Sequence, residues 1–208
     1  MLTVTDGTGC FLKITNEMVK YIELQRTGYG ADVDIEKCYE KDIQKDYDSI
    51  KSYLPETCSR ILDIGCGLAG IDLFLYNHYN GTPELRLLDY SKIDEKIHYG
   101  YQNVGSVYNN LELSAQFLKL NGVDKKKIGI HNAAVSFPYY KYDIIISLLS
   151  CGFHYPVRTY LKHILDTKSG IVILDIRKHS NQIPLLNDNF NTVQMIAEYS
   201  KCERYLLK

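Results

Sequence analysis

The sequence has no tryptophan, only five prolines and no excess of either charge, with 24 lysines and arginines against 25 acids among 208 residues. The net charge of -1 excludes a general electrostatic attraction to nucleic acid. No apolar run approaches the roughly 20 residues that span a bilayer, and the N-terminus lacks the basic and then apolar order of a signal peptide. We therefore expect a soluble, cytoplasmic protein with no membrane partner.

The sequence also lacks the cysteine spacings that are typical of metal sites and of disulfide frameworks. The six cysteines are scattered along the chain and form no C-x-x-C pair, so the sequence indicates neither a zinc site nor a disulfide framework. No pair of acids and amides stands out as a magnesium site. We expect reduced thiols and a metal-independent protein.

The pattern of apolar residues predicts one α/β unit of ordinary composition, 45% hydrophobic and 24% charged. Residues 1–57 are expected to form an N-terminal helical cap, and residues 58–208 the core, with no repeat or linker between them. Helices are expected at 15–26, 35–54, 69–80, 109–120 and 157–165. Strands are expected at 60–64, 84–89, 127–134, 142–149, 170–176, 192–198 and 202–207.

The stretch RILDIGCGLAG, residues 60–70, carries the most information. Its apolar first half suits a parallel strand covered on both faces, and Gly65 and Gly67 allow a tight turn in which backbone approaches a ligand. The helix that follows points its N-terminal amides at that ligand. This order is typical of a nucleotide-cofactor loop, although a glycine turn that only packs a helix on a strand is the alternative.

Asp63 separates two cofactor classes. GCGLAG matches the dinucleotide fingerprint G-x-G-x-x-G, but a carboxylate that pointed at a pyrophosphate would add like-charge repulsion. S-adenosylmethionine (SAM) instead carries a sulfonium and an ammonium. DIGCGLAG resembles the first motif of class I SAM-dependent methyltransferases. The resemblance implies a single Rossmann-like, doubly wound sheet, mostly parallel with an antiparallel C-terminal edge strand and preceded by helices.

Further cofactor contacts follow from the same resemblance. The strand 84–89 ends in Asp89, at the distance from Asp63 expected of a βαβ unit, and an acid there accepts from both ribose hydroxyls or caps its own loop. The resemblance implies that Asp89 binds the ribose and that Tyr90 packs near the adenine. It assigns the methionine end to Asp63, Gly65, Cys66 and Gly67, with the Cys66 thiol interpreted as a small buried hydrophobic group.

The third strand ends in an amide where the family often has an acid. Asn132 can still accept from the adenine amine and donate to a ring nitrogen, so Asn132 and Ala133 are the expected adenine contacts.

The exit of the fourth strand, SCGFHYP, is where chemistry is expected, because ligands of open α/β sheets lie beyond the carboxyl ends of the strands. His154 is the candidate general base, since imidazole titrates near neutral pH; capping of the following helix is its structural alternative. Positioning alone can supply most of the rate of methyl transfer. Ser147 and Ser150 are candidates to orient the reactants, and Tyr155 to form an apolar wall of the acceptor pocket.

The sequence thus predicts a SAM-dependent methyltransferase that acts on an oxygen or nitrogen of a small-molecule acceptor. An RNA or other nucleic-acid methyltransferase is the first alternative, although Lys125–Lys127 is the single compact basic cluster. An NAD(P)-dependent oxidoreductase is the second, but the tyrosine and lysine four residues apart, Tyr47 and Lys51, precede the glycine loop. A SAM-binding protein without transferase activity is the third.

Overall fold

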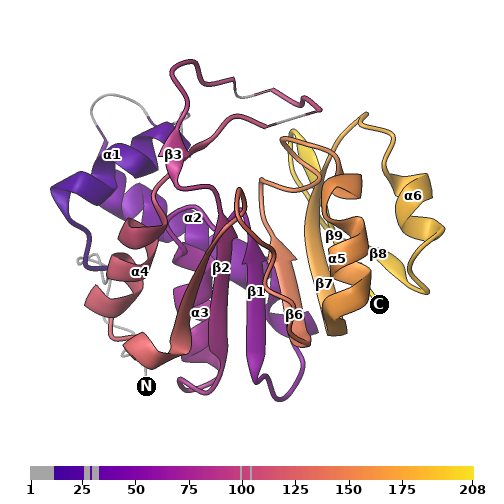
Figure 1. Cartoon of the computed structure of the whole chain (residues 1–208), viewed down its shortest axis with the longest axis horizontal. Coiled ribbons are helices and arrows are strands. Elements are labelled where there is room, and N and C mark those ends of the chain that lie inside the picture. The colour runs from indigo at the N-terminus through magenta and orange to yellow at the C-terminus, as the bar shows by residue number, and fades with distance from the viewer. Residues whose placement is uncertain (1–11, 26–28, 30–32, 99, 104) are drawn as a thin grey trace.

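A seven-stranded sheet forms the centre of the computed structural model, which describes residues 12–25, 29, 33–98, 100–103 and 105–208 (Figure 1). The strand order is β5-β2-β1-β6-β7-β9-β8. β9 runs antiparallel to both its neighbours, whereas the other pairs are parallel. The strands are β1 Arg60–Ile64, β2 Glu84–Asp89, β5 Ile128–Asn132, β6 Tyr142–Ser147, β7 Lys168–Arg177, β8 Val193–Glu198 and β9 Cys202–Leu207.

The mixed sheet with a C-terminal antiparallel strand is therefore confirmed, with β9 placed between β7 and the outermost strand β8. The helices are α1 Asn16–Gln25, α2 Ile35–Ile50, α3 Gly70–His78, α4 Leu111–Leu120, α5 Leu161–Thr167 and α6 Ile183–Asn187. None of the helices in the described ranges is long and apolar enough to cross a bilayer. The expected turn at 27–30, apart from Tyr29, lies outside the described residues.

Both faces of the sheet are covered, which explains why the central strands are apolar throughout. Ile61 of β1 packs into the cluster under α1 to α4, whereas Leu62 and Ile64 pack into the cluster under α5 and α6. The same alternation holds in β6, where Ile144 and Ile145 face opposite clusters. Two layers of helices therefore hold the sheet between them (Figure 1).

The strand order reverses at β1, since β2 and β5 lie on one side of it and β6 and β7 on the other. At such a reversal the loops leaving adjacent strands diverge and leave a crevice at the carboxyl ends. The exits of β1 and β6 flank this crevice.

The segment between β2 and α4, for which the apolar pattern predicts neither helix nor strand, contains two short strands. Its ends pair as two short antiparallel strands, β3 Lys92–Ile93 and β4 Tyr108–Asn109, and the chain between them extends above the carboxyl ends of the sheet (Figure 1). Strands of two residues leave no readable alternation, which is why the pattern predicted no structure here. The short helix α6 was missed for the same reason.

A buried ion-pair network attaches α2 to the sheet. The guanidinium of Arg204 on β9, 1% exposed, donates to Asp175 on β7 at 2.7 and 2.8 Å and to Asp46 on α2 at 2.9 Å. Its third nitrogen donates to Ser49 Oγ at 2.7 Å. Because every charge in the network has a partner, the network fixes the position of α2 over the sheet at a tolerable desolvation cost.

Arg204→Met should destabilise the protein by about 3–5 kcal/mol, because it leaves the fully buried Asp175 without its cation. Urea unfolding at pH 7 measures this loss. The matched control is Arg158→Met, which removes an exposed arginine bonded only to Asn103 and should change the free energy of unfolding by less than about 0.5 kcal/mol. Equal stability of the two variants would contradict the structural role of the network.

Candidate active site

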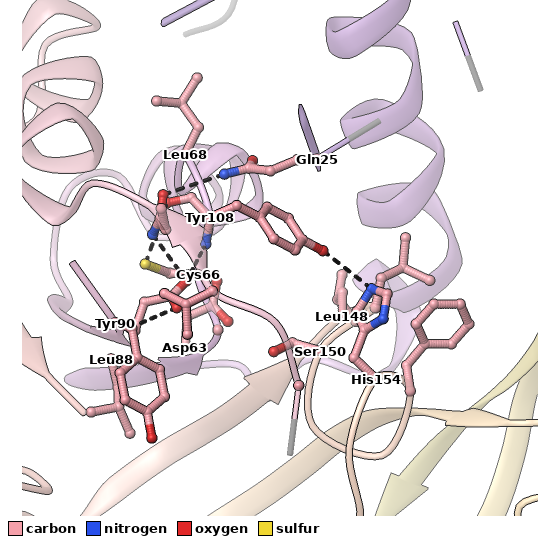
Figure 2. Close-up of a pocket in the computed structure, with 18 of the residues that line it drawn as sticks. Gln25, Asp63, Cys66, Leu68, Leu88, Tyr90, Tyr108, Leu148, Ser150 and His154 are labelled. Atoms are coloured by element: carbon pink, nitrogen blue, oxygen red, sulfur yellow. Dashed lines mark hydrogen bonds between the residues drawn. The ribbon is translucent and has the colours of Figure 1, made fainter. Parts of the chain in front are cut away.

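The carboxyl ends of β1, β2 and β6 open into a cavity of about 490 Å³ (Figure 2). Its walls come from the glycine loop after β1, the segment 105–109, the exit of β6 and the end of β7. This volume lies in the range of small-molecule and cofactor sites. The cavity is thus at the crevice where the strand order reverses.

Two glycines give the loop its shape. Gly65 has φ +75°, and a Cβ built on it lies 1.8 Å from Ser150 Oγ, so only glycine lets the β6 exit approach. Gly67 has φ +52°, and a Cβ there lies 2.8 Å from Oε1 of Gln25 on α1. The loop is therefore enclosed from the β6 side and from the α1 side.

Asp89 at the end of β2 holds the glycine loop. Its Oδ2 accepts from the backbone N–H of Gly67 at 3.1 Å and from Nδ2 of Asn109 at 2.9 Å, and its Oδ1 accepts from Tyr90 N at 2.7 Å. Asn109 also donates to Gly67 O and accepts from Gln25 Nε2 at 3.3 Å. Burial raises the pKa of Asp89, whereas these hydrogen bonds favour the ionised form and lower it. Burial has the larger effect, and the resulting pKa is about 6.

A pair of buried carboxyl groups lies beneath the loop. Asp63, 2% exposed, lines the cavity, and Asp72 on α3 is fully buried with no hydrogen-bonding partner for either carboxyl oxygen. Burial raises the pKa of Asp72 to about 7. Burial, then the charges of Asp72 and Asp89, raise the pKa of Asp63 well above its usual range. The groups that act on Asp63 are thus all acids, and a cation in the cavity would relieve their repulsion.

The β6 exit forms the opposite wall. Ser150 Oγ lies 3.2 Å from Tyr155 OH. Nε2 of His154 lies 3.4 Å from Tyr108 OH, and a dashed line in Figure 2 marks this contact. All four residues line the cavity. Burial, and then the charge of Arg177, lower the pKa of His154, so its imidazole is neutral at neutral pH and able to accept a proton.

Of the other predicted cofactor residues, some line the cavity and others do not. Cys66 lines the cavity, and burial raises the pKa of its thiol well above the usual value, so it is the neutral form that faces the pocket. Tyr90, 36% exposed, lies at the rim, and Ala133 also lines the cavity.

Asn132 and Ser147 are not among the described residues that line the cavity. Asn132 Oδ1 accepts from Ala134 N at 2.9 Å and so shapes the loop that presents Ala133. Ser147, fully buried, donates to Ile64 O at 2.6 Å and accepts from Cys151 N at 2.9 Å. Both side chains are used to hold the loops around the cavity.

Among the cavity residues that were not anticipated from the sequence are Gln25, Tyr108, Asn109 and Arg177. Each comes from an element whose approach to the cavity depends on tertiary packing. The single local signal was the tyrosine-rich character of the segment before α4.

No protein-family model matches the sequence, and no curated protein matches it. Solved structures do. A methyltransferase from Pyrococcus furiosus aligns with a TM-score of 0.56 at 14% identity, over 92% of this chain and 94% of that chain. The chain has the fold of the class I SAM-dependent methyltransferases.

Two further structures agree with this assignment of the methyltransferase fold. A ribosomal protein L11 methylase from Lactobacillus delbrueckii gives a TM-score of 0.55 at 14% identity, over 79% of this chain and 77% of that one. A precorrin-6y C5,15-methyltransferase from Geobacter metallireducens gives a TM-score of 0.52 at 10% identity, over 80% of this chain and 86% of that one.

Within the described ranges, no group of three or more histidines, cysteines and acids is placed to hold a metal ion.

Asp72→Asn should stabilise the protein at pH 8 more than at pH 5. The folded-state pKa of about 7 lies above the usual 3.8, so the cost of the buried charge grows as the pH rises between these values and is complete above them. The difference between the two pH values should reach about 2–4 kcal/mol in urea unfolding.

The control for this measurement is Asp188→Asn, which changes an exposed acid directly after α6, far along the chain from the glycine loop. It should show no such difference. An effect of Asp72→Asn that is equal at both pH values would show that Asp72 is not the titrating acid.

Proposed function

We propose that the protein is a SAM-dependent methyltransferase that methylates an oxygen or nitrogen of a small-molecule acceptor without a metal ion. The observation that carries the proposal is the uncompensated carboxyl group of Asp63 inside the cavity of a methyltransferase fold. A ligand with a sulfonium and an ammonium supplies the cations that these acids lack. The residues present therefore fit SAM.

The proposed contacts divide the cofactor among the strand ends. Asp63 and the amides of the glycine loop would hold the methionine end, and Asp89 the ribose hydroxyls through lone pairs that its protein bonds leave over. Tyr90 and Ala133 would take the adenine, with Asn132 fixing the Ala133 loop. SAM supplies a methyl group on a positively charged sulfur when it is bound.

The remaining cavity residues would act on the acceptor. His154, neutral and half-buried, is proposed to accept the proton of the acceptor's hydroxyl or amine at Nε2, the atom that faces Tyr108. Ser150 and Tyr155 would orient the acceptor, and Ser147 would hold their loop. Residues 1–57 are proposed as a cap on the core 58–208, because α1 and α2 bring Gln25 and Tyr39 to the cavity.

Asp63 also weighs against the dinucleotide alternative. A diphosphate against the loop amides would lie beside a buried acid whose neighbours are further acids, which is unfavourable at short range. The cavity is thus better suited to a cationic cofactor than to a nicotinamide dinucleotide.

Calorimetric titration should detect binding of SAM and of S-adenosylhomocysteine, which keeps the ammonium, and no binding of NADH. Asp63→Asn should weaken both by about 10- to 100-fold, because it removes a charge-assisted interaction worth about 1.4–2.7 kcal/mol. Asp188→Asn is the matched control and should bind like wild type. Binding of NADH but not of SAM would favour the oxidoreductase and defeat the proposal.

Once labelled SAM has identified an acceptor, His154→Ala should lower turnover by about 10²- to 10⁴-fold with an unchanged affinity for SAM. In the wild type, activity should be lost as the pH falls, with a midpoint below the usual histidine pKa of 6.5, because burial lowers the pKa of His154.

The control is His179→Asn, an exposed histidine whose φ of +63° asparagine tolerates. It should retain full turnover. Wild-type turnover in His154→Ala would mean that positioning alone drives the reaction and that no base acts.

A further inference from the structure

Arg177 is a charged side chain of the cavity whose guanidinium has no hydrogen bond or ion pair with the residues that the structure describes. It ends β7, lines the cavity beside Phe153 and His154, and places its guanidinium carbon 4.7 Å from the centre of the Phe153 ring. Its Nη1 is buried without a hydrogen-bonding partner, and the described part of the chain offers it no ion pair. A buried donor left unpaired in this way is costly unless a ligand satisfies it.

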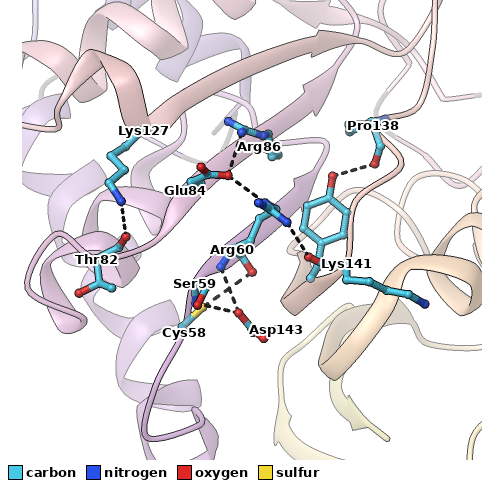
Figure 3. Close-up of polar contacts among 11 residues, drawn as sticks. Cys58, Ser59, Arg60, Thr82, Glu84, Arg86, Lys127, Pro138, Lys141 and Asp143 are labelled. Carbon is cyan, nitrogen blue, oxygen red and sulfur yellow. Dashed lines mark hydrogen bonds and ion pairs between the residues drawn. The ribbon is translucent and has the colours of Figure 1, made fainter.

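The other described arginines are all engaged. Arg60 and Arg86 share the carboxylate of Glu84 at 2.9 Å each, at the amino ends of β1 and β2 (Figure 3). Arg204 holds two acids, and Arg158 donates to Asn103 at 3.2 Å. Among the five described arginines, Arg177 alone has no hydrogen bond or ion pair from its guanidinium.

Acids are present on the far side of Arg177, in a second cavity of about 360 Å³, but they are occupied. Glu198 pairs with Lys178 at 2.6 Å, and Glu203 accepts from Tyr205 OH at 2.7 Å. Arg177 lines both cavities, and because these two acids already have partners, we assign its unpaired donor to a ligand in the cavity that it shares with His154.

The active-site cavity is lined by groups of both charges. Asp63 and Asp89 line it at the glycine loop, whereas Arg177 lines it from the end of β7 and the exposed Lys201 from the turn between β8 and β9. Arg177 lies close enough to His154 for its positive charge to lower the pKa of that imidazole. A molecule bound at this wall meets both the cation and the proposed base.

We propose that the methyl acceptor is an aromatic carboxylate, with its carboxylate bound by Arg177 and its accepting hydroxyl or amine directed to His154. A planar guanidinium matches a carboxylate in geometry as well as charge. Tyr108 and Tyr155 supply flat apolar walls for the ring. This inference rests on the proposed function and names its substrate class.

The test uses matched probes on the whole protein saturated with S-adenosylhomocysteine. Hydroxybenzoates and aminobenzoates are compared with the corresponding neutral amides by calorimetry and by ligand-observed NMR. The wild type should bind at least one carboxylate more than tenfold tighter than its amide. Arg177→Met should abolish this preference, and Arg177→Lys should keep part of it.

Two readouts separate recognition from structure. S-adenosylhomocysteine affinity should stay within twofold in Arg177→Met. The melting temperature of this variant should be equal to or above that of the wild type, because the guanidinium has no hydrogen bond or ion pair to lose among the described residues and methionine can keep the contact with the Phe153 ring. Arg158→Met is the matched control and should leave the carboxylate preference intact.

The outcomes distinguish this inference from the function on which it rests. A protein that binds S-adenosylhomocysteine but no carboxylate more tightly than its amide, or an Arg177→Met variant that keeps the preference, overturns the acceptor class alone. A protein that binds no S-adenosylhomocysteine overturns the methyltransferase proposal as well.

Discussion

Beneath the glycine loop, the carboxyl groups of Asp63, Asp72 and Asp89 act on one another at the carboxyl ends of β1 and β2. Burial makes their negative charges costly; the side chains of Asp63 and Asp72 interact with each other, whereas backbone amides and the Asn109 amide donate to Asp89. The cavity therefore contains buried negative charge that no lysine or arginine of the described residues neutralises. The cofactor proposed for the site is the cation that this arrangement lacks.

The arginines on the neighbouring strands β7 and β9 differ in whether their charges are paired within the described part of the protein. Arg204 on β9 is enclosed by Asp175 and Asp46, so its charge is used to fix α2 on the sheet. That attachment carries Tyr39 and Ile43 of α2 to the cavity wall. Arg177 at the end of β7 has no such partner, so its charge remains available to a ligand.

Much of the fold could be predicted because its central strands are continuous apolar runs followed by turn residues. The β1 strand, its glycine loop and α3 follow each other locally, and Asp63 and Asp89 are positioned by their places at strand ends, so all lie where the pattern indicates. The segment between β2 and α4 could not be predicted, because its two-residue strands are defined by their pairing with each other and not by their own sequences.

The site could be predicted in part for the same reason. Asn132 and Ser147 were identified by their positions after strands, but the direction of a side chain at a strand exit is decided by the loop it bonds, and both turn to backbone groups. Asn109 bonds to Gly67, which lies 42 residues before it in the chain. Gln25, which bonds to Asn109, lies on a helix before β1. No local spacing encodes such contacts.

The succession of strands and helices along the chain, the glycine loop and the acid in front of it can be derived from the amino-acid sequence, because these features depend on backbone conformation and on apolar periodicity over a few residues. Which charges are neutralised and which are left unpaired depends instead on the assembled fold. Burial and pairing depend on groups that are distant along the chain, so the partnered state of Arg204 and the unpartnered states of Asp72 and Arg177 arise only when the sheet is assembled.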